Sequence, residues 1–259
     1  MEVPGMITRS MFTSREGDTI PQLGSFLVDH RTPLAQRWGG WFVTGNHGAP
    51  PYGGLSHMGN VTTTLKGTAD IASTSNEVLI EWLNSDAAAR AYLSRESDIA
   101  ALMVFDHQMH AINLLTRLNW ETRVAADGGV PDFAAGTLRD LVDETVDYFL
   151  FVGEAPPPAR LTPSAGFAQR FAARAPRDRH GRSLRDLDLE HRLLRYPCSY
   201  MIDSQAFAAL PQAARDAIYA RMSAILSGRD AGAKYAHLSP EDRRAIAEIL
   251  RATKSDAPF

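Results

Sequence analysis

The run from Glu96 to Arg123, ESDIAALMVFDHQMHAINLLTRLNWETR, constrains the fold of this chain more than any other stretch because it contains neither Gly nor Pro. It is long enough for about seven helical turns at 3.6 residues per turn. Apolar residues occupy most of its circumference, which is typical of a helix surrounded by protein. The sequence therefore predicts a central core helix over residues 96–123.

One line of polar residues crosses this predicted helix, at Asp106, His110, Asn113, Arg117 and Glu121. Their spacings of four, three, four and four residues place them on one face, with His107 beside His110. The line is either structural, as the solvent-facing side of an amphipathic helix or a satisfied polar network in the core, or it is a buried site. In the second interpretation Asp106, His107 and His110 converge on a transition metal such as iron or on a redox cofactor, because imidazole and carboxylate are suitable ligands.

The pattern predicts a mainly α-helical protein with two parts. Residues 1–70 are rich in turn-forming residues and lack helical periodicity, so we expect an irregular, loop-rich segment with a few short strands, the best at 25–29 and 41–44. Residues 71–259 form the helical domain around the central helix. Its other helices are expected near residues 75–82, 87–93, 137–152, 165–175, 199–209, 212–226 and 240–254. The last has a clear start, with Ser239 as the cap and Pro240 at the first helical position.

The composition, 44% hydrophobic and 22% charged, is that of an ordinary globular protein. A formal net charge of -3 gives no general attraction to nucleic acid or to an anionic membrane. No apolar run approaches the ~18 residues that a membrane-spanning helix needs, and the first residues lack the pattern of a signal peptide. Taken as given, the sequence predicts a cytoplasmic protein.

Several familiar catalytic patterns are absent from the sequence: the Walker loop, the dinucleotide fingerprint, HExxH and GxSxG. Cys198 is the only cysteine, which excludes an intrachain disulfide and a cysteine-cluster zinc site. A Cys198 nucleophile paired with His191 is one interpretation, but a lone cysteine between Pro and apolar neighbours is more typical of a buried packing residue.

Two further groups of residues are candidate cofactor contacts. His57 and Met58 are adjacent in an irregular segment, and His or Met is what a six-coordinate haem takes as its distal ligand. His47 lies in the same segment. Between residues 174 and 195, arginines alternate with carboxylates, and Arg182 and Arg185 belong to this segment. It is either a solvated, mutually paired surface or a clamp for an anion such as a haem propionate.

Three strings occur in order along the chain: Gly24 through RWGGWFVTGNHG to HMGN, then LMVFDHQMHAINLLTRLNWETR, then GRSLRDLDLEHRLLRYPCSYMIDSQAFAALP. Together they resemble the region that follows the haem-attachment segment in uncharacterised bacterial c-type cytochrome proteins. The resemblance implies haem binding and electron transfer in the periplasm, with a redox partner protein or a small electron carrier. It implies a distal-ligand role for His57 or Met58, and a second ligand site or a redox-linked proton relay at His107 and His110.

The chain departs from that family in one respect, because it contains no CxxCH and so has no point at which haem c could be attached. Either it is the part of a longer exported cytochrome that lies after the attachment segment, or it is a relative that has lost the haem. The leading hypothesis is a haem-associated redox protein. The alternatives are a non-haem metalloenzyme, which uses Asp106, His107 and His110 with a carboxylate from residues 137–152, and a helical interaction module without catalysis.

Overall fold

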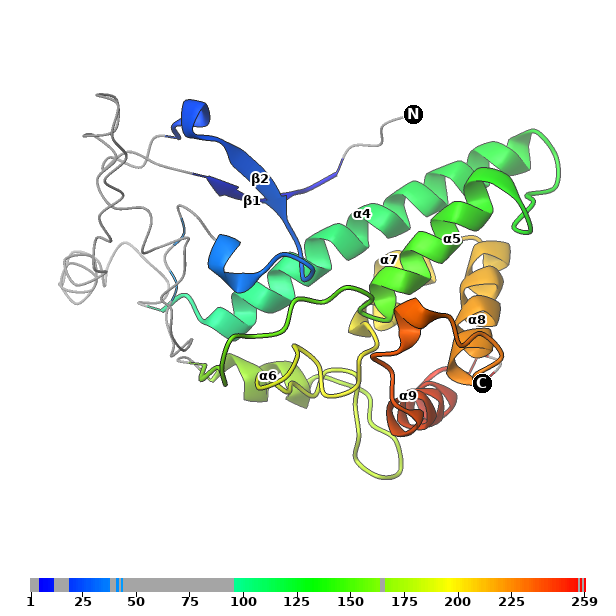
Figure 1. Ribbon diagram of the computed structural model, residues 1–259. Helices are drawn as coiled ribbons and strands as arrows, with labels where there is room; N and C mark the ends of the chain where they lie inside the picture. The colour runs from blue at the N-terminus through cyan, green and yellow to red at the C-terminus, as the bar shows by residue number, and fades with distance from the viewer. Residues whose placement is uncertain are drawn as a thin grey trace.

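The structure is a computed structural model that describes residues 5–11, 19–37, 41, 43, 96–163, 166–255, 257 and 259. It is mainly helical, with one two-stranded antiparallel sheet near the N-terminus, as the sequence predicts. Figure 1 shows the long helix α4 (Ile99–Asp127) crossing the molecule, with the sheet on one side of it and α6 (Phe167–Ala173) on the other. None of the described helices is both long and apolar enough to span a membrane.

Helix α4 confirms the predicted central helix and extends one turn past its predicted end. It begins after Asp98, whose side chain accepts a hydrogen bond from the Ala100 amide, and it continues to Gly128 because no helix-breaking residue occurs earlier. Its first two thirds are buried on most sides, as expected for a core helix. Trp120 and Val124, in its last turns, are exposed.

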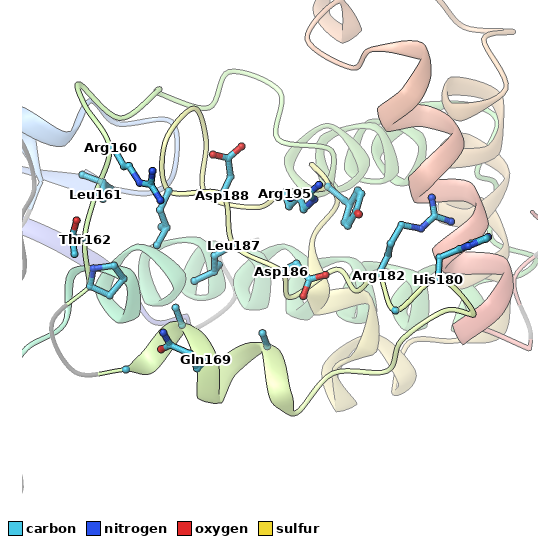
Figure 2. Close-up of a pocket in the computed structure, with 17 residues that line it drawn as sticks. Arg160, Leu161, Thr162, Gln169, His180, Arg182, Asp186, Leu187, Asp188 and Arg195 are labelled. Carbon is cyan, nitrogen blue, oxygen red and sulfur yellow. The ribbon is translucent and has the colours of Figure 1, made fainter.

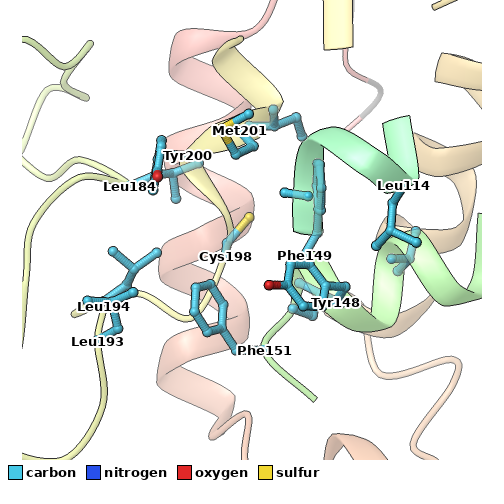
Figure 3. Packing of buried hydrophobic residues seen from close by; sticks show 14 of the residues in the cluster. Leu114, Tyr148, Phe149, Phe151, Leu184, Leu193, Leu194, Cys198, Tyr200 and Met201 are labelled. Carbon is cyan, nitrogen blue, oxygen red and sulfur yellow. The ribbon is translucent and has the colours of Figure 1, made fainter. Parts of the chain in front are cut away.

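The other helices pack around α4 and close one core. Helix α5 (Gly136–Phe149) runs back along α4 as a helical hairpin, and α8 (Gln212–Leu226) packs against α5 (Figure 1). Helix α9 (Pro240–Thr253) packs on α8. Aromatic and aliphatic side chains fill the space between these helices, and Figure 3 shows Phe149, Phe151 and Met201 among them. This core fixes the positions of the buried α4 side chains considered below.

The sheet pairs β1 (Thr8–Met11) with β2 (Ser25–Val28), with Thr8 opposite Val28. Strand β2 confirms the strand predicted at residues 25–29. The chain then turns through the 3-10 helix η2 (Leu34–Gln36), and Val28 and Leu34 are buried. The segment that joins β2 to η2 is thereby held against the helical core. It carries His30, and Arg37 follows directly after η2.

The helix predicted at residues 199–209 is wrong, because two shorter elements replace it. A 3-10 turn, η4 (Tyr200–Asp203), leads into α7 (Gln205–Ala208). Ser204 separates them in an extended conformation, and its side chain accepts a hydrogen bond from the Phe207 amide as the cap of α7.

Three predicted elements receive little or no test. The predicted strand at residues 41–44 is described only at Trp41 and Val43, which are not in a strand. The helices predicted at 75–82 and 87–93, and the proposed boundary near residue 70, lie outside the described residues. They remain predictions.

The start of α9 gives a direct test of local sequence reasoning. Ser239 Oγ accepts a hydrogen bond from the Asp242 amide at 3.0 Å, and the Asp242 carboxylate accepts one from the Ser239 amide at 3.4 Å. We expect Ser239→Ala to lower the free energy of unfolding by ~1 kcal/mol, measured by urea denaturation. Ser227→Ala, at the exposed end of α8, is the control and should change it by no more than ~0.5 kcal/mol. An equal effect of the two substitutions would contradict the capping role.

Candidate functional site

Two buried imidazoles lie at the contact between the β2–η2 segment and α4. The Nδ1 atoms of His30 and His107 are 2.7 Å apart, and both side chains are almost fully buried. The backbone carbonyl of His30 accepts hydrogen bonds from the Ala155 amide and from the Arg37 guanidinium. His30 is therefore fixed from three directions: by η2, by the segment after α5, and by α4.

A serine from a third part of the chain extends this contact. His107 Nε2 lies 2.7 Å from Ser199 Oγ, so that His30, His107 and Ser199 form one hydrogen-bonded chain, which we call the imidazole chain. Ser199 is fully buried, and its Oγ also accepts the Met201 amide as the cap of η4. Within the described residues, His30 Nε2 has no hydrogen-bond partner.

The imidazole chain permits two arrangements of its protons. If Ser199 Oγ donates to His107 Nε2, then His107 Nδ1 carries hydrogen and donates to His30 Nδ1. If His107 Nε2 donates to Ser199 Oγ, then His30 Nδ1 donates to His107 Nδ1. Both arrangements satisfy the same four atoms, and they differ in whether His30 Nε2 carries a proton. Changing the first arrangement into the second therefore releases a proton from His30 Nε2 and takes one up at Ser199 Oγ.

Aromatic rings enclose the two imidazoles. The ring of Tyr148, on α5, stacks on His30 with centroids 4.1 Å apart, and Phe151 stacks on His107 at 4.5 Å. The Tyr148 hydroxyl donates to the His107 carbonyl at 3.1 Å. Burial in this enclosure lowers the pKa of His107 to about 3 and the pKa of His30 well below its usual value. Both imidazoles are therefore neutral at neutral pH.

A buried ion pair lies next to the imidazole chain. Arg37 Nη1 is 3.7 Å from the Asp106 carboxylate, and both side chains are excluded from solvent. The Arg37 guanidinium also donates to the carbonyls of Thr32 and His30, at 2.6 and 2.7 Å. Burial lowers the pKa of Arg37, and the negative charge of Asp106 opposes that effect.

The three α4 side chains that the sequence groups as metal ligands each contact different neighbours. Asp106 faces Arg37, whereas His107 bonds to His30 and Ser199. His110 Nε2 lies 3.4 Å from Arg31 Nη2. In the part of the chain that the structure describes, no three His, Cys, Asp or Glu side chains are placed so that they could hold a metal ion. The spacing on α4 brings these residues to one region but not to one point.

Toward the C-terminal end of α4, the polar line becomes the solvent-facing side of the helix. Asn113 hydrogen-bonds the backbone of Met6, and Arg117 is exposed and 4.0 Å from Glu144. The line thus changes along the helix: Asp106, with His107 beside it, is buried, and Arg117 is in solvent.

The remaining candidate cofactor contacts lie elsewhere. His47, His57 and Met58 are outside the described residues. Arg182 is held between Asp178 and Glu248, at 2.6 and 2.5 Å. It lines one end of an elongated cavity of about 820 Å³, with Arg160 toward the other end (Figure 2).

Arg185 and Cys198 also have described surroundings. The Arg185 guanidinium lies 5.3 Å from the centre of the Phe171 ring and 5.4 Å from that of Tyr200. Cys198 is fully buried in the core (Figure 3), and this burial raises the pKa of its thiol far above the usual value. His191, its suggested partner, is exposed and lies beside Asp188. A buried packing role for Cys198 fits these surroundings, because a reactive thiol is a partly exposed thiolate.

Sequence reasoning missed three of the contributing residues: His30, Tyr148 and Ser199. Their only sequence signal was indirect, since His30 follows a predicted strand and Ser199 lies in a string that carries the family resemblance. The chain has no match among protein-family models, and no curated protein or solved structure shows significant similarity to it.

Proposed function

We propose that this chain belongs to a haem-associated electron-transfer protein of the c-type cytochrome kind, in which the imidazole chain moves a proton in response to a change of charge. One observation carries the proposal. The three strings that resemble the cytochrome proteins cover residues 24–60, 102–123 and 181–211, and they contribute His30, His107 and Ser199 respectively. Segments that are far apart in sequence thus meet in a single hydrogen-bonded chain.

The described residues do not themselves fit a haem. Covalent attachment needs two accessible cysteines in CxxCH, whereas Cys198 is single and buried. His107 has both ring nitrogens engaged, and His30 is closed in by Tyr148 and Phe151. In this proposal the haem contacts therefore fall to His47, His57 and Met58.

In this proposal the described residues contribute the proton transfer, which takes place along the imidazole chain. A neutral imidazole pair in a dry enclosure has two proton arrangements, which differ in the tautomer of each ring and therefore in the direction of its dipoles. A change of charge nearby favours one arrangement over the other, and that preference is strong because little solvent screens it. Arg37 and Asp106 hold a fixed pair of charges beside the chain and so set its resting arrangement.

The test is to isolate the natural protein that contains this chain from its own host, assay haem by the pyridine haemochrome and record the reduced-minus-oxidised spectrum. We expect one haem per protein and a spectrum that changes in His57→Ala or in Met58→Ala. His180→Ala, at an exposed histidine, is the matched control and should leave the spectrum unchanged. A natural protein without haem, and without any absorbance change on reduction, would overturn the proposal.

The two alternative functions have less support. The metalloenzyme hypothesis needs Asp106, His107 and His110 to converge on one point. Their separate partners do not support that convergence. Metal analysis of the same sample distinguishes it, because a stoichiometric non-haem metal lost in His110→Ala would favour it. The interaction-module hypothesis does not explain why three segments meet in a buried hydrogen-bonded chain.

A further inference from the structure

A short hairpin, residues 186–195, has an open backbone edge. Two backbone hydrogen bonds, of 2.8 and 3.0 Å, join its arms, one at Asp186 and one at Asp188. Leu187 lies between these two bonds, opposite Leu194 on the other arm. In an antiparallel ladder, a pair in this position directs its N–H and C=O groups away from the partner arm. The backbone groups of Leu187 therefore point to the outer edge of the hairpin.

Only part of this outer edge is paired. The Leu161 amide donates a hydrogen bond to the Leu189 carbonyl at 2.7 Å. Leu189 has a φ of 63°, and this left-handed conformation turns the chain at the end of the arm. The N–H and C=O of Leu187, two residues earlier, have no hydrogen-bond partner among the described residues. The edge thus pairs with another backbone segment at Leu189 and is open at Leu187.

The open edge lines the elongated cavity of about 820 Å³ in Figure 2. Helix α6 forms the facing wall, and Figure 2 shows Leu187 and Gln169 on opposite walls. Leu187 is only partly buried, so a ligand in the cavity can reach its backbone. The volume lies within the range of roughly 300–1,000 Å³ that is typical of ligand pockets. The cavity therefore has room for a segment of chain beside the hairpin.

The unpaired charge around this cavity is positive. Arg195 is exposed, and in the part of the chain that the structure describes it has no ion-pair partner. Arg160 has only one contact with a carboxylate, at 4.0 Å, and both of those side chains are exposed. The two acidic lining residues are already bound: Asp186 to Arg177 at 2.9 Å, and Asp188 to two backbone amides. An acidic group on a ligand would therefore be attracted to this cavity.

We propose that this cavity binds an extended, acidic peptide segment of another protein, which adds to the open edge of the hairpin at Leu187. The peptide backbone accepts a hydrogen bond from the Leu187 amide and donates one to its carbonyl, and an acidic side chain lies near Arg195. Backbone pairing at an open edge supplies affinity for peptides, and side-chain contacts supply selectivity. A small anion would use only the arginine, whereas an extended peptide uses the donor, the acceptor and the positive charge together.

Amide hydrogen exchange tests the edge directly. In the free protein, the Leu187 amide should exchange with solvent at least roughly tenfold faster than the Asp188 amide, which is bonded within the hairpin. The probe is a capped hexapeptide of alternating valine and glutamate, titrated into nitrogen-15-labelled protein. Saturable shifts are expected at Leu187, and its exchange should slow roughly tenfold in the complex. A Leu187 amide that is as protected as Asp188 without the peptide would contradict an open edge.

Changes to the peptide separate backbone pairing from side-chain contacts. Every second amide of an extended strand points to the same edge. N-methylation at the valines, or at the glutamates, should therefore weaken binding roughly tenfold in one of the two peptides and much less in the other. A hexapeptide with lysine in place of glutamate should bind more weakly than the original, and equal binding would exclude an acidic partner.

Variants of the protein test the same contacts from the other side. Leu187→Pro removes the outward amide donor and should bind the hexapeptide roughly tenfold more weakly than Leu187→Ala, which keeps the donor and loses only the side chain. Arg195→Gln should weaken binding roughly threefold, and Arg139→Gln, at an exposed arginine on α5, is the matched control. Thermal unfolding verifies that each variant is folded, and the N-methylated peptides decide the question if Leu187→Pro is not. No saturable binding of the hexapeptide, or equal binding of it and both N-methylated forms, overturns the proposal.

Discussion

Arg37→Met is expected to lower the free energy of unfolding by ~3–5 kcal/mol, one of the two largest effects predicted for this protein. The guanidinium is almost fully buried and supports the carbonyls of Thr32 and His30 as well as the Asp106 carboxylate. Methionine fills a similar volume but donates no hydrogen bond, so two carbonyls and a buried negative charge lose a cationic neighbour. Urea denaturation at pH 7 measures the change.

Two matched variants separate the buried charge from other causes. Arg37→Met/Asp106→Leu removes both charges and should recover part of the loss, because replacing a whole buried pair costs less than breaking it. Arg139→Met removes an exposed arginine that pairs with Asp140, and we expect a change within ~0.5 kcal/mol. A loss below ~1 kcal/mol in Arg37→Met would mean that the buried pair is energetically minor.

The sequence predicted the elements that local patterns determine. A long apolar run without Gly or Pro led to α4, and the Ser-Pro-Glu-Asp start led to α9, because capping and periodicity act within a few residues. The same local reasoning failed at Ser204, where a single side-chain cap divides one predicted helix into η4 and α7. Ser, like Asp, competes with the helical backbone for hydrogen bonds, and composition alone does not show which interaction prevails.

For a related reason, the sequence predicted the α4 residues of the candidate site but not their partners. Periodicity showed that Asp106, His107 and His110 share a face of α4, since that depends on helical geometry alone. It could not show what lies opposite that face. His30 is 77 residues away from His107 in sequence and Ser199 is 92 residues away, and both are brought there by tertiary packing. The face alone suggested a metal centre, and the structure adds that each of the three residues contacts different partners across it.

The second large effect is a loss of stability in acid that comes from the imidazole pair. In the unfolded chain a histidine takes up a proton below about pH 6.5, whereas the buried His107 remains neutral down to about pH 3. Between these values the unfolded state binds more protons, so the free energy of unfolding falls as pH falls. The loss is at most ~1.4 kcal/mol per pH unit and ~4–5 kcal/mol in all, and the lowered pKa of His30 acts in the same direction.

Glu154 changes the free energy of unfolding with pH in the opposite direction, so its contribution must be separated from that of the imidazole pair. Burial raises the pKa of its carboxyl to about 7, so the folded state binds more protons between about pH 4.5 and pH 7, and its contribution to stability falls as pH rises through that range. His30→Leu/His107→Leu leaves Glu154 in place. The difference in unfolding free energy between the wild type and this double variant, plotted against pH, therefore isolates the imidazole pair.

We expect the unfolding free energy of the wild type, minus that of the double variant, to be largest above pH 6.5. By about pH 4 this difference should have fallen by several kcal/mol. His107→Leu alone should be less stable than the double variant at pH 7, because it leaves His30 Nδ1 buried without its partner, whereas removing both imidazoles leaves apolar side chains in an aromatic enclosure. His180→Ala, at an exposed histidine, should follow the wild-type curve. If the wild type and the double variant gave parallel curves, the two imidazoles would have to be protonated as readily in the folded protein as in the unfolded chain, and a neutral, proton-displacing pair would be excluded.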